Sequence, residues 1–253
     1  MSRLQKIGLV AFSVFVVFAV VFSYLINSQF IRMPEKPWHM QPFIDADSLS
    51  ADYVAKYKLL DKRKLFSRFS DSSQITVAIL IDAWGVPFDE SRLGADFALF
   101  EGLPHREFLH NRLANRTRHA EHAEFRHAGG GFYLFGGDSL EYDRNTYIDS
   151  LGFTQHQFCQ KCSDSVMLGK LDSLLSLDSL FVPEEAKVIA LTTQNSRDGD
   201  RAKLHATLRL IAAVARRHPE ARFIVQGTHR PILGDPKIRR ESFTRWVPAV
   251  VIN

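Results

Sequence analysis

Cysteines are scarce in this chain of 253 residues, which has only two, Cys159 and Cys162, in the sequence Cys-Gln-Lys-Cys. Because no second pair is present, a zinc site with four cysteine ligands is excluded. The pair could form a tight disulfide, part of a mixed zinc site or a redox dithiol. The flanking residues lack a thioredoxin-like context, so a redox role is the least favoured of these interpretations.

A strong excess of charge of either sign is also missing. The chain has 32 Lys and Arg against 28 Asp and Glu, which gives a net charge of +4 at pH 7. A charge this small and diffuse predicts no nucleic-acid partner. Internal repeats and low-complexity segments are absent too, and the 45% hydrophobic and 24% charged content is ordinary for a globular protein. We therefore expect one soluble domain beside any N-terminal segment.

The N-terminal segment carries the clearest physical signal, a run from Ile7 to Ile26 without a charged residue. A helix of this length is about 30 Å long, which matches the hydrocarbon core of a membrane. Arg3 and Lys6 precede the run and favour a cytoplasmic N-terminus. A cleaved signal peptide is the alternative, but the residues Tyr24–Phe30 are a poor cleavage site.

These features predict a single-pass protein of the cytoplasmic (inner) membrane. We expect a cytoplasmic N-terminus at 1–6, a transmembrane signal anchor at 7–27, a tether and helical lead-in at 28–70, and a folded domain at 71–253. That domain would lie outside the cytoplasm, in the periplasm if the cell has one. In such an oxidising compartment, a disulfide is the favoured interpretation of the cysteine pair.

Beyond the predicted anchor, strand-like and helix-like stretches alternate along the chain. The expected strands are 75–81, 129–135, 187–193, 222–226 and 247–253. The expected helices are a lead-in at 52–66, helical material at 93–113 interrupted at 102–104, a helix opening near Thr117, a short helix between Asp143 and Gly152, and longer helices at 164–177 and 200–218. This alternation predicts an α/β fold with a mostly parallel central sheet and helices on both faces.

Asp82 is the first candidate site residue. It follows the apolar run Ile75–Ile81 and leads into Ala83-Trp84-Gly85. Ligands of α/β proteins bind just beyond the carboxyl ends of such buried strands, so Asp82 stands where an enzyme of this class keeps its chemistry. The alternative is that its side chain only caps the turn after the strand.

Thr117 is the second candidate. The stretch Asn115–His127 begins with a capping-type residue and continues with strong helix formers, which places Thr117 at or near a helix N-terminus. Unpaired backbone NH groups and the helix dipole favour an anion at such a position. A plain N-cap hydroxyl is the alternative to a nucleophile.

Taken together, the stretches from about Ile75 to Asn253 resemble the alkaline phosphatase and sulfatase superfamily, within it the membrane-anchored lipoteichoic acid synthase-like and phosphoethanolamine transferase-like branch. Asp82 stands where the first strand of that family ends in an acidic metal ligand. Thr117–Glu121 matches the family's Thr-x-x-Ala-Glu stretch, whose threonine is the nucleophile. The order of the motifs along the domain is more specific than any one of them.

Further matches follow in the same order. Tyr142–Arg144 resembles an aromatic-x-Arg pair that holds the phosphate-bearing headgroup, and Leu151–Phe153 resembles the end of the short helix after it. Ser163–Asp164 resembles the start of the next helix. Gly227–His229 stands where the family has Gly-Asp-His, so the resemblance makes His229 a metal ligand.

The chain departs from the family's pattern at three positions. Thr228 replaces the aspartate beside His229, and a neutral hydroxyl binds a divalent ion more weakly than a carboxylate does. The family's substrate-side histidine has no match within Thr193–Arg197, and Phe135 stands where relatives often have histidine.

The resemblance therefore implies a membrane-anchored, extracytoplasmic sulfatase-like hydrolase or phospho-group transferase. Its substrate would be an envelope lipid or glycan, and the nucleophile would be Thr117, activated by one or more divalent ions (Zn, Mn or Mg). Asp82 and His229 would bind metal, and Tyr142 and Arg144 would bind substrate. The alternative is a catalytically degenerate relative that binds an anionic lipid or a protein partner, with Thr228 as the mark of the lost activity.

Overall fold

The computed structural model describes residues 12, 14–19, 49–60, 65–66, 74–111, 117–125, 131–137, 150–176, 188–193, 199–231 and 241–253. The chain divides into two compact units, Met1–Asp45 and Ala46–Asn253. In the first unit, the described residues are helical and Phe12, Phe15 and Phe18 are exposed. Among the residues that the structure describes, no helix combines the length and the apolar character that a bilayer span requires. Most of the predicted 7–27 anchor lies outside them.

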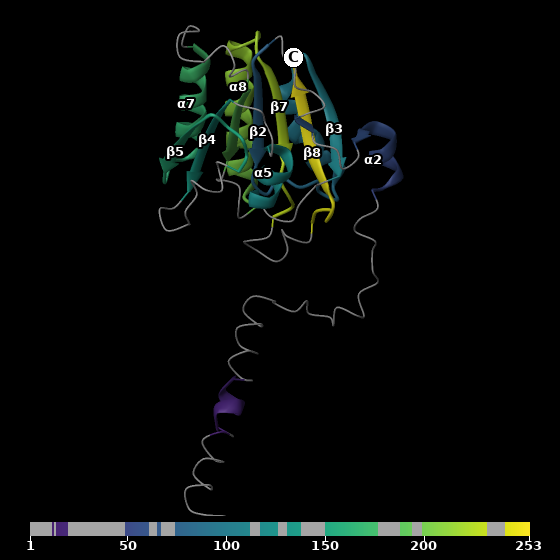
Figure 1. Ribbon diagram of the computed structural model, residues 1–253. Helices are drawn as coiled ribbons and strands as arrows, with labels where there is room; N and C mark the ends of the chain where they lie inside the picture. The colour runs from purple at the N-terminus through teal and green to yellow at the C-terminus, as the bar shows by residue number, and fades with distance from the viewer. Residues whose placement is uncertain are drawn as a thin grey trace, which may run out of the picture. The chain divides into compact units, whose positions relative to one another are not determined.

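The second unit is built on one large sheet (Figure 1). Its strands are β1 (Lys58–Leu60), β2 (Thr76–Ile81), β3 (His105–Asn111), β4 (Phe132–Gly137), β5 (Gln155–Gln160), β6 (Val188–Thr193), β7 (Arg222–Gly227) and β8 (Trp246–Ile252), in the spatial order β1-β3-β8-β7-β2-β6-β4-β5. Strand β8 pairs antiparallel with β3 and β7, and the other described pairs are parallel. The predicted, mostly parallel sheet is confirmed.

Helices cover both faces of this sheet, as predicted (Figure 1). They are α2 (Ala51–Lys56), α4 (Glu90–Phe97), α5 (Thr117–Phe125), α7 (Asp164–Ser176) and α8 (Arg201–Arg217), with the 3₁₀ turn η2 at Ala98–Phe100. Side chains of β2 alternate between two cores. Val77, Ile79 and Ile81 pack in the core that includes α4, α7 and α8, and Ala78 and Leu80 pack in the core that includes α5. Strand β2 is therefore buried on both sides, which explains its unbroken apolar sequence.

Most of the expected elements are present near their predicted bounds. Strands β2, β6, β7 and β8 match the apolar runs, and β4 follows the glycine-rich stretch before it. Helix α7 matches the expectation at 164–177. Helix α8 begins after Asp200, whose side chain accepts hydrogen bonds from the backbone NH groups of Ala202 and Lys203. The short helix expected between Asp143 and Gly152 lies largely outside the described residues.

The prediction of helical material at 93–113 is wrong in its second half. Helix α4 and the turn η2 end at Phe100, Gly102 adopts a φ of 80°, and the residues from His105 to Asn111 form strand β3. This strand pairs with β1 on one side and with β8 on the other. The polar sequence of β3 gives no strand signal. Its conformation is set by pairing with two neighbouring strands and not by local propensity.

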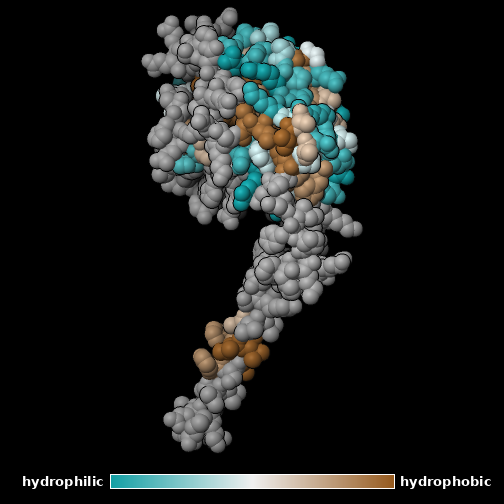
Figure 2. All heavy atoms as spheres, turned by 90° about the vertical axis from the view of Figure 1, so that its right-hand side faces the viewer, coloured by the Kyte–Doolittle hydropathy of each residue, from teal (hydrophilic) through white to brown (hydrophobic). Residues whose placement is uncertain are grey.

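Two further strands had no signal in the sequence. Strand β5 exposes all its side chains except Cys159, so it lacks an apolar pattern. Strand β1 follows α2 within the expected lead-in at 52–66, and it joins the sheet through β3. The second compact unit begins at Ala46. On the side nearest α2, the described surface is largely hydrophilic around a small hydrophobic patch (Figure 2).

The two cysteines form a disulfide. Cys159 and Cys162 are joined across a Cα–Cα distance of 5.5 Å, between the end of β5 and the segment before α7. The favoured interpretation of the Cys-Gln-Lys-Cys sequence is therefore confirmed, and no free cysteine is left for a zinc site.

Two glycines let the turn after β2 approach the turn after β7. A Cβ atom on Gly227 would lie 1.9 Å from the carbonyl oxygen of Trp84, and one on Gly85 would lie 2.7 Å from the Cα of Arg230. Both distances are far below van der Waals contact, so only glycine fits. The two strand ends therefore touch through their backbones, and the residues that follow them are brought together.

The substitution Gly227→Ala should destabilise the protein by about 1–3 kcal/mol or more, because the new methyl group would force the Trp84 carbonyl away. Gly94→Ala on helix α4 is the matched control, since nothing lies within 4 Å of its added Cβ. That control should gain about 0.5–1 kcal/mol through helix propensity. Urea unfolding of both variants measures the difference, and equal midpoints would contradict the close contact.

Candidate active site

The turn after β2 presents Asp82 to the carboxyl edge of the sheet. The Asp82 side chain is only 2% exposed, and the next residue, Ala83, has a φ of 59°. This left-handed conformation is unfavourable for a residue with a Cβ, and it persists only where the surroundings fix it. The strained turn redirects the chain directly after the carboxylate, so Asp82 stays at the strand end and Trp84 turns back into the core.

The turn after β7 presents His229 beside it. The ring Nδ1 lies 2.7 Å from the backbone oxygen of Arg230. Because a carbonyl only accepts hydrogen bonds, Nδ1 carries a proton and donates it there. The other ring nitrogen, Nε2, faces Thr117 and Asp82, and it offers a lone pair when it carries no proton.

Helix α5 supplies Thr117, its first residue. The helix is tied to β7 by the buried Glu124, whose Oε1 accepts from the Gln226 side chain at 3.3 Å and whose Oε2 accepts from the backbone NH of Leu65 at 3.0 Å. Phe125 packs edge-on against Tyr133 of β4, with ring centroids 5.7 Å apart. These contacts fix α5 on the sheet, and its N-terminus with Thr117 lies over the strand ends.

The three side chains meet. Thr117 Oγ1 donates to Asp82 Oδ1 at 2.6 Å and lies 3.2 Å from His229 Nε2. His229 Nε2 and Asp82 Oδ1 are 3.2 Å apart. Residues 35 and 112 positions from Thr117 are thus within hydrogen-bond distance of its hydroxyl. We call this cluster the Asp82–Thr117–His229 trio.

The trio has fewer protons than its contacts require. The carboxylate oxygen and the Nε2 lone pair of a neutral imidazole are both acceptors, and the Thr117 hydroxyl has one proton to share. The 3.2 Å distance between His229 Nε2 and Asp82 Oδ1 brings two acceptor atoms together, which is favourable only if a proton or a cation lies between them. A second proton on the imidazole or a bound cation would each serve.

A comparison with solved structures finds several chains of similar fold. They include the lipoteichoic acid synthase LtaP from Listeria monocytogenes, with 10% identity, a TM-score of 0.48 and coverage of 70% of this chain and 65% of that one. The C-terminal periplasmic domain of EcEptC from Escherichia coli has 9% identity, a TM-score of 0.45 and coverage of 71% and 72%. The phosphoglycerol transferase GacH from Streptococcus pyogenes, in complex with sn-glycerol-1-phosphate, has 12% identity, a TM-score of 0.45 and coverage of 71% and 68%.

These likenesses agree with the α/β fold predicted from the sequence, and the branch of the alkaline phosphatase superfamily that the sequence resembles stays an expectation. The chain spans 65% of the length of the lipoteichoic acid synthase. No family model matches it, and no curated protein does either. At these identities and TM-scores, the likeness concerns the fold and says nothing about the role of any residue.

The trio fits part of the metal centre that the superfamily implies. Ligand atoms about 2.0–2.2 Å from an ion in tetrahedral coordination would be roughly 3.3–3.6 Å from one another. The two 3.2 Å distances from His229 Nε2, to Asp82 Oδ1 and to Thr117 Oγ1, come near this range. The 2.6 Å between Thr117 Oγ1 and Asp82 Oδ1 is a hydrogen-bond distance and lies well below it. Within the described ranges, however, no group of three His, Cys, Asp or Glu side chains is placed to hold an ion. Asp82 and His229 could thus supply two ligands, one of them a carboxylate, while the Thr117 hydroxyl is hydrogen-bonded to that carboxylate.

Thr228 explains why a second carboxylate is missing from this cluster. It is buried, and its Oγ1 accepts from the backbone NH of Ala83 and donates to the backbone oxygen of Ile81, each at 3.4 Å. Its own backbone NH also donates to Ile81 at 3.0 Å. Thr228 thus joins the end of β7 to the strained turn after β2, where the superfamily pattern has a charged ligand.

The remaining sequence candidates have different outcomes. Tyr142 and Arg144 lie outside the described residues, as do residues 194–198 of the loop where a substrate-side histidine was sought. Phe135 is buried within an aromatic group on β4 and β5, with its ring 5.3 Å from that of Tyr133 and 5.2 Å from that of Phe158. It packs the sheet face that also receives α5.

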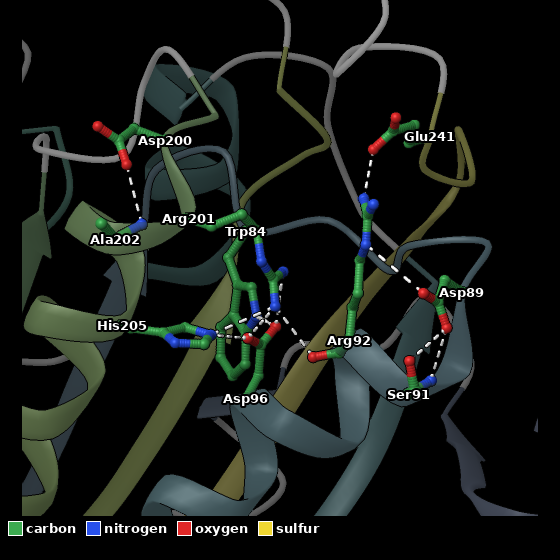
Figure 3. A network of polar contacts seen from close by, with 10 residues as sticks. All are labelled: Trp84, Asp89, Ser91, Arg92, Asp96, Asp200, Arg201, Ala202, His205 and Glu241. Carbon is green, nitrogen blue, oxygen red and sulfur yellow. Dashed lines mark hydrogen bonds and ion pairs between the residues drawn. The ribbon is translucent and has the colours of Figure 1, made fainter.

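Sequence reasoning missed a second polar cluster next to the trio. Asp96 of α4 is fully buried and contacts Trp84, Arg201 and His205 (Figure 3). One signal could have revealed it. Asp96 stands between the buried residues Leu93 and Phe97 on a short amphipathic helix, and a carboxylate in such a position needs partners.

The substitution Thr117→Val tests the geometry of the trio. It keeps the shape of the side chain but removes the hydroxyl that bridges Asp82 and His229, so the free energy of unfolding should fall by about 1.5–3 kcal/mol, the range for a hydrogen bond to a charged group. Thr117→Ser keeps the hydroxyl and is the control. Urea unfolding at pH 7 measures both, and a Val variant as stable as the wild type would show that the hydroxyl is not bound to the carboxylate.

Proposed function

We propose that this protein is a membrane-anchored, extracytoplasmic phospho-group transferase or hydrolase whose nucleophile is Thr117. The observation that carries the proposal is the convergence of Asp82, Thr117 and His229 at distances of 2.6–3.2 Å. A hydroxyl, a carboxylate and an imidazole nitrogen from three separate elements meet at the carboxyl edge of the sheet, where α/β proteins bind ligands.

Each member of the trio has a role in this proposal. The Thr117 hydroxyl donates to Asp82 Oδ1, so its proton already points toward a group that can accept it. Its oxygen would attack phosphorus in line, which breaks the bond to the leaving group and forms a phosphothreonine. An acceptor hydroxyl or water would then take the phospho group and free Thr117. The backbone NH groups at the start of α5 suit the anionic oxygens of that group.

A divalent cation held by Asp82 and His229 would lower the pKa of the Thr117 hydroxyl and stabilise charge on the phospho group. The zinc, manganese or magnesium ion of the sequence prediction is part of this proposal. Tyr142 would cover the substrate headgroup and Arg144 would pair with the phosphate, both by resemblance to the superfamily.

The proposed location and substrate rest on the sequence. The uncharged run Ile7–Ile26 supports a single-pass anchor at 7–27, with residues 1–6 in the cytoplasm and the domain after the 28–70 segment outside it. The disulfide agrees with an oxidising compartment. The substrate would be an envelope lipid or glycan with a phosphodiester, in keeping with the names of the lipoteichoic acid synthase and the phosphoglycerol transferase.

The full chain, purified in detergent micelles with zinc, manganese or magnesium, should hydrolyse a chromogenic phosphodiester such as bis-p-nitrophenyl phosphate. Thr117→Ala should lower kcat about 10³-fold or more, because it removes the nucleophile. Chelation of the divalent ions should also abolish turnover. Mass spectrometry of the wild type after an acid quench should find a phospho group on the peptide that contains Thr117.

The control is Ser173→Ala on α7, which removes a hydroxyl bonded only to the backbone oxygen of Gly169 and should leave kcat unchanged. A wild type that turns over no phosphodiester with any of these ions would overturn the proposal.

A binding function without catalysis is the second candidate, and one observation favours it. The site has a single carboxylate within the described residues, because Thr228 replaces the charged ligand of the superfamily pattern. A cation held by so few charged ligands binds weakly. Under this alternative, the domain would bind an anionic lipid or a protein partner.

The substitution Thr228→Asp distinguishes the two candidates. It adds a negative charge beside His229, so the affinity for zinc or manganese should rise about tenfold or more, and turnover should rise at limiting ion concentration. Thr228→Asn is the matched control, because its side chain has the shape of aspartate without the charge. Isothermal titration with the metal alone measures the affinity. No gain over the Asn variant, together with no turnover, would favour the binding function.

A further inference from the structure

We propose that Asp96 is a positioning residue for the Asp82–Thr117–His229 trio and that it acts through Trp84. The inference rests on the proposed function, because it assigns a role in setting the geometry of that site. Asp96 contacts Trp84, Arg201 and His205. Its effect on the trio would pass through Trp84, in the turn that begins at Asp82.

Asp96 is a fully buried carboxylate whose oxygens contact nitrogen atoms of Trp84, Arg201 and His205 (Figure 3). Oδ2 accepts from Trp84 Nε1 at 3.0 Å and from Arg201 Nη1 at 3.3 Å. Oδ1 accepts from Arg201 Nη2 at 2.6 Å and faces His205 Nε2 at 2.8 Å. The guanidinium binds both oxygens, so the buried charge is neutralised and its lone pairs are used. The carboxylate is therefore held in one orientation, with Oδ2 aimed at the indole.

This arrangement exceeds what stability alone requires. A buried ion pair is often no more stabilising than apolar residues of the same volume, because both charges lose their hydration. What the pair does supply is directional contact. Arg201 and His205 belong to the first turns of α8, and Arg201 also donates to the backbone oxygen of Arg92 on α4. Asp96 thus fixes the Trp84 ring against two helices at once.

Trp84 transmits this orientation to the site. Its ring is fully buried and packs edge-on against Phe97, with centroids 6.2 Å apart. Its carbonyl oxygen lies against the Cα of Gly227, where a Cβ would come within 1.9 Å. Trp84 is two residues after Asp82, and Gly227 is two residues before His229. A shift of Trp84 therefore moves both the carboxylate and the imidazole of the trio.

The strained Ala83 makes this restraint necessary. A residue with a Cβ at a φ of 59° tends to relax to a negative φ unless its neighbours prevent it. Relaxation would rotate the peptide between Asp82 and Trp84 and swing the indole out of its place. The hydrogen bond from Trp84 Nε1 to Asp96 opposes that rotation, so it keeps Asp82 in line with Thr117.

The test compares Asp96→Asn, Trp84→Phe and the double variant in the full chain. The first change replaces one carboxylate oxygen by an NH₂ group that cannot accept from Trp84 or Arg201, and the second keeps an aromatic ring but loses the indole donor. Each single variant should lower kcat for bis-p-nitrophenyl phosphate about tenfold with KM within twofold of the wild type. The double variant should be no worse than the more damaged single variant, because both changes interrupt one path.

The matched control is Asp89→Ala, which removes the N-cap of the same helix α4 without touching Trp84. It should lower the melting temperature by less than Asp96→Asn does, because losing an exposed N-cap costs less than breaking a buried ion pair. It should leave kcat within twofold at a temperature where all variants are folded. A kcat that falls in step with melting temperature across all four variants would overturn the proposal and leave Asp96 a purely structural residue.

A second readout separates this inference from the proposed function. The ring ¹⁵N shifts of His229, assigned by comparison with His229→Gln, should move in Asp96→Asn and Trp84→Phe and stay unchanged in Asp89→Ala. This measurement needs no turnover. Unchanged His229 shifts in the first two variants would overturn the positioning role, whereas shifted signals in a protein without activity would support it and would count against the proposed function alone.

Discussion

The backbone contact between the turns after β2 and β7 is the constraint on which the candidate site depends. The two strands are neighbours in register, with Ile81 opposite Gly227, so their ends reach the same edge of the sheet. Gly227 lies against the Trp84 carbonyl, and the Thr228 NH donates to Ile81. Without that close approach, Asp82 and His229 would follow their strands into separate loops. Helix α5 then needs only to place one hydroxyl above a junction that already exists.

The charge at this junction is low for the metal centre that the proposed function would require. One carboxylate, one imidazole and one hydroxyl meet, and the neighbouring Thr228 uses its hydroxyl on backbone groups. The cluster is thus less negative than one with two carboxylates, and it gains less from a doubly charged ion. The same reduction lowers its repulsion of an anionic phosphate. Under the proposed function, Thr228 would therefore have two opposing effects: weaker binding of a cation and weaker repulsion of a phosphate anion.

Much of the fold could be predicted from sequence, because its central elements are locally consistent. Strand β2 is apolar throughout since both its faces are buried, and α8 combines an Asp200 cap with an apolar stripe. Strand β3 was predicted as helix because its polar residues carry no strand pattern, and β5 was missed because it is an exposed edge. In both cases, pairing partners distant in sequence decide the structure.

In the candidate site, too, the sequence indicates the residues but not their arrangement in space. Asp82, Thr117 and His229 could be selected by motif order, but their closeness follows from the sheet order, which places β7 beside β2 although 140 residues separate Asp82 from Arg222. No local pattern encodes that neighbourhood. The position of Asp96 between Leu93 and Phe97 could have drawn attention to it, but its partners Arg201 and His205 are more than 100 positions away in the sequence.

The disulfide at the far end of the sheet has a consequence for following the protein in a cell. The chain has no cysteines besides Cys159 and Cys162, and both are consumed in that bond. A molecule that has folded under oxidising conditions therefore has no thiol that a thiol-specific dye could label. A molecule that stays in a reducing compartment keeps two free thiols, and both can react with the dye. Labelling of the two cysteines thus reports whether a molecule folded in an oxidising or a reducing compartment, and no added tag is needed.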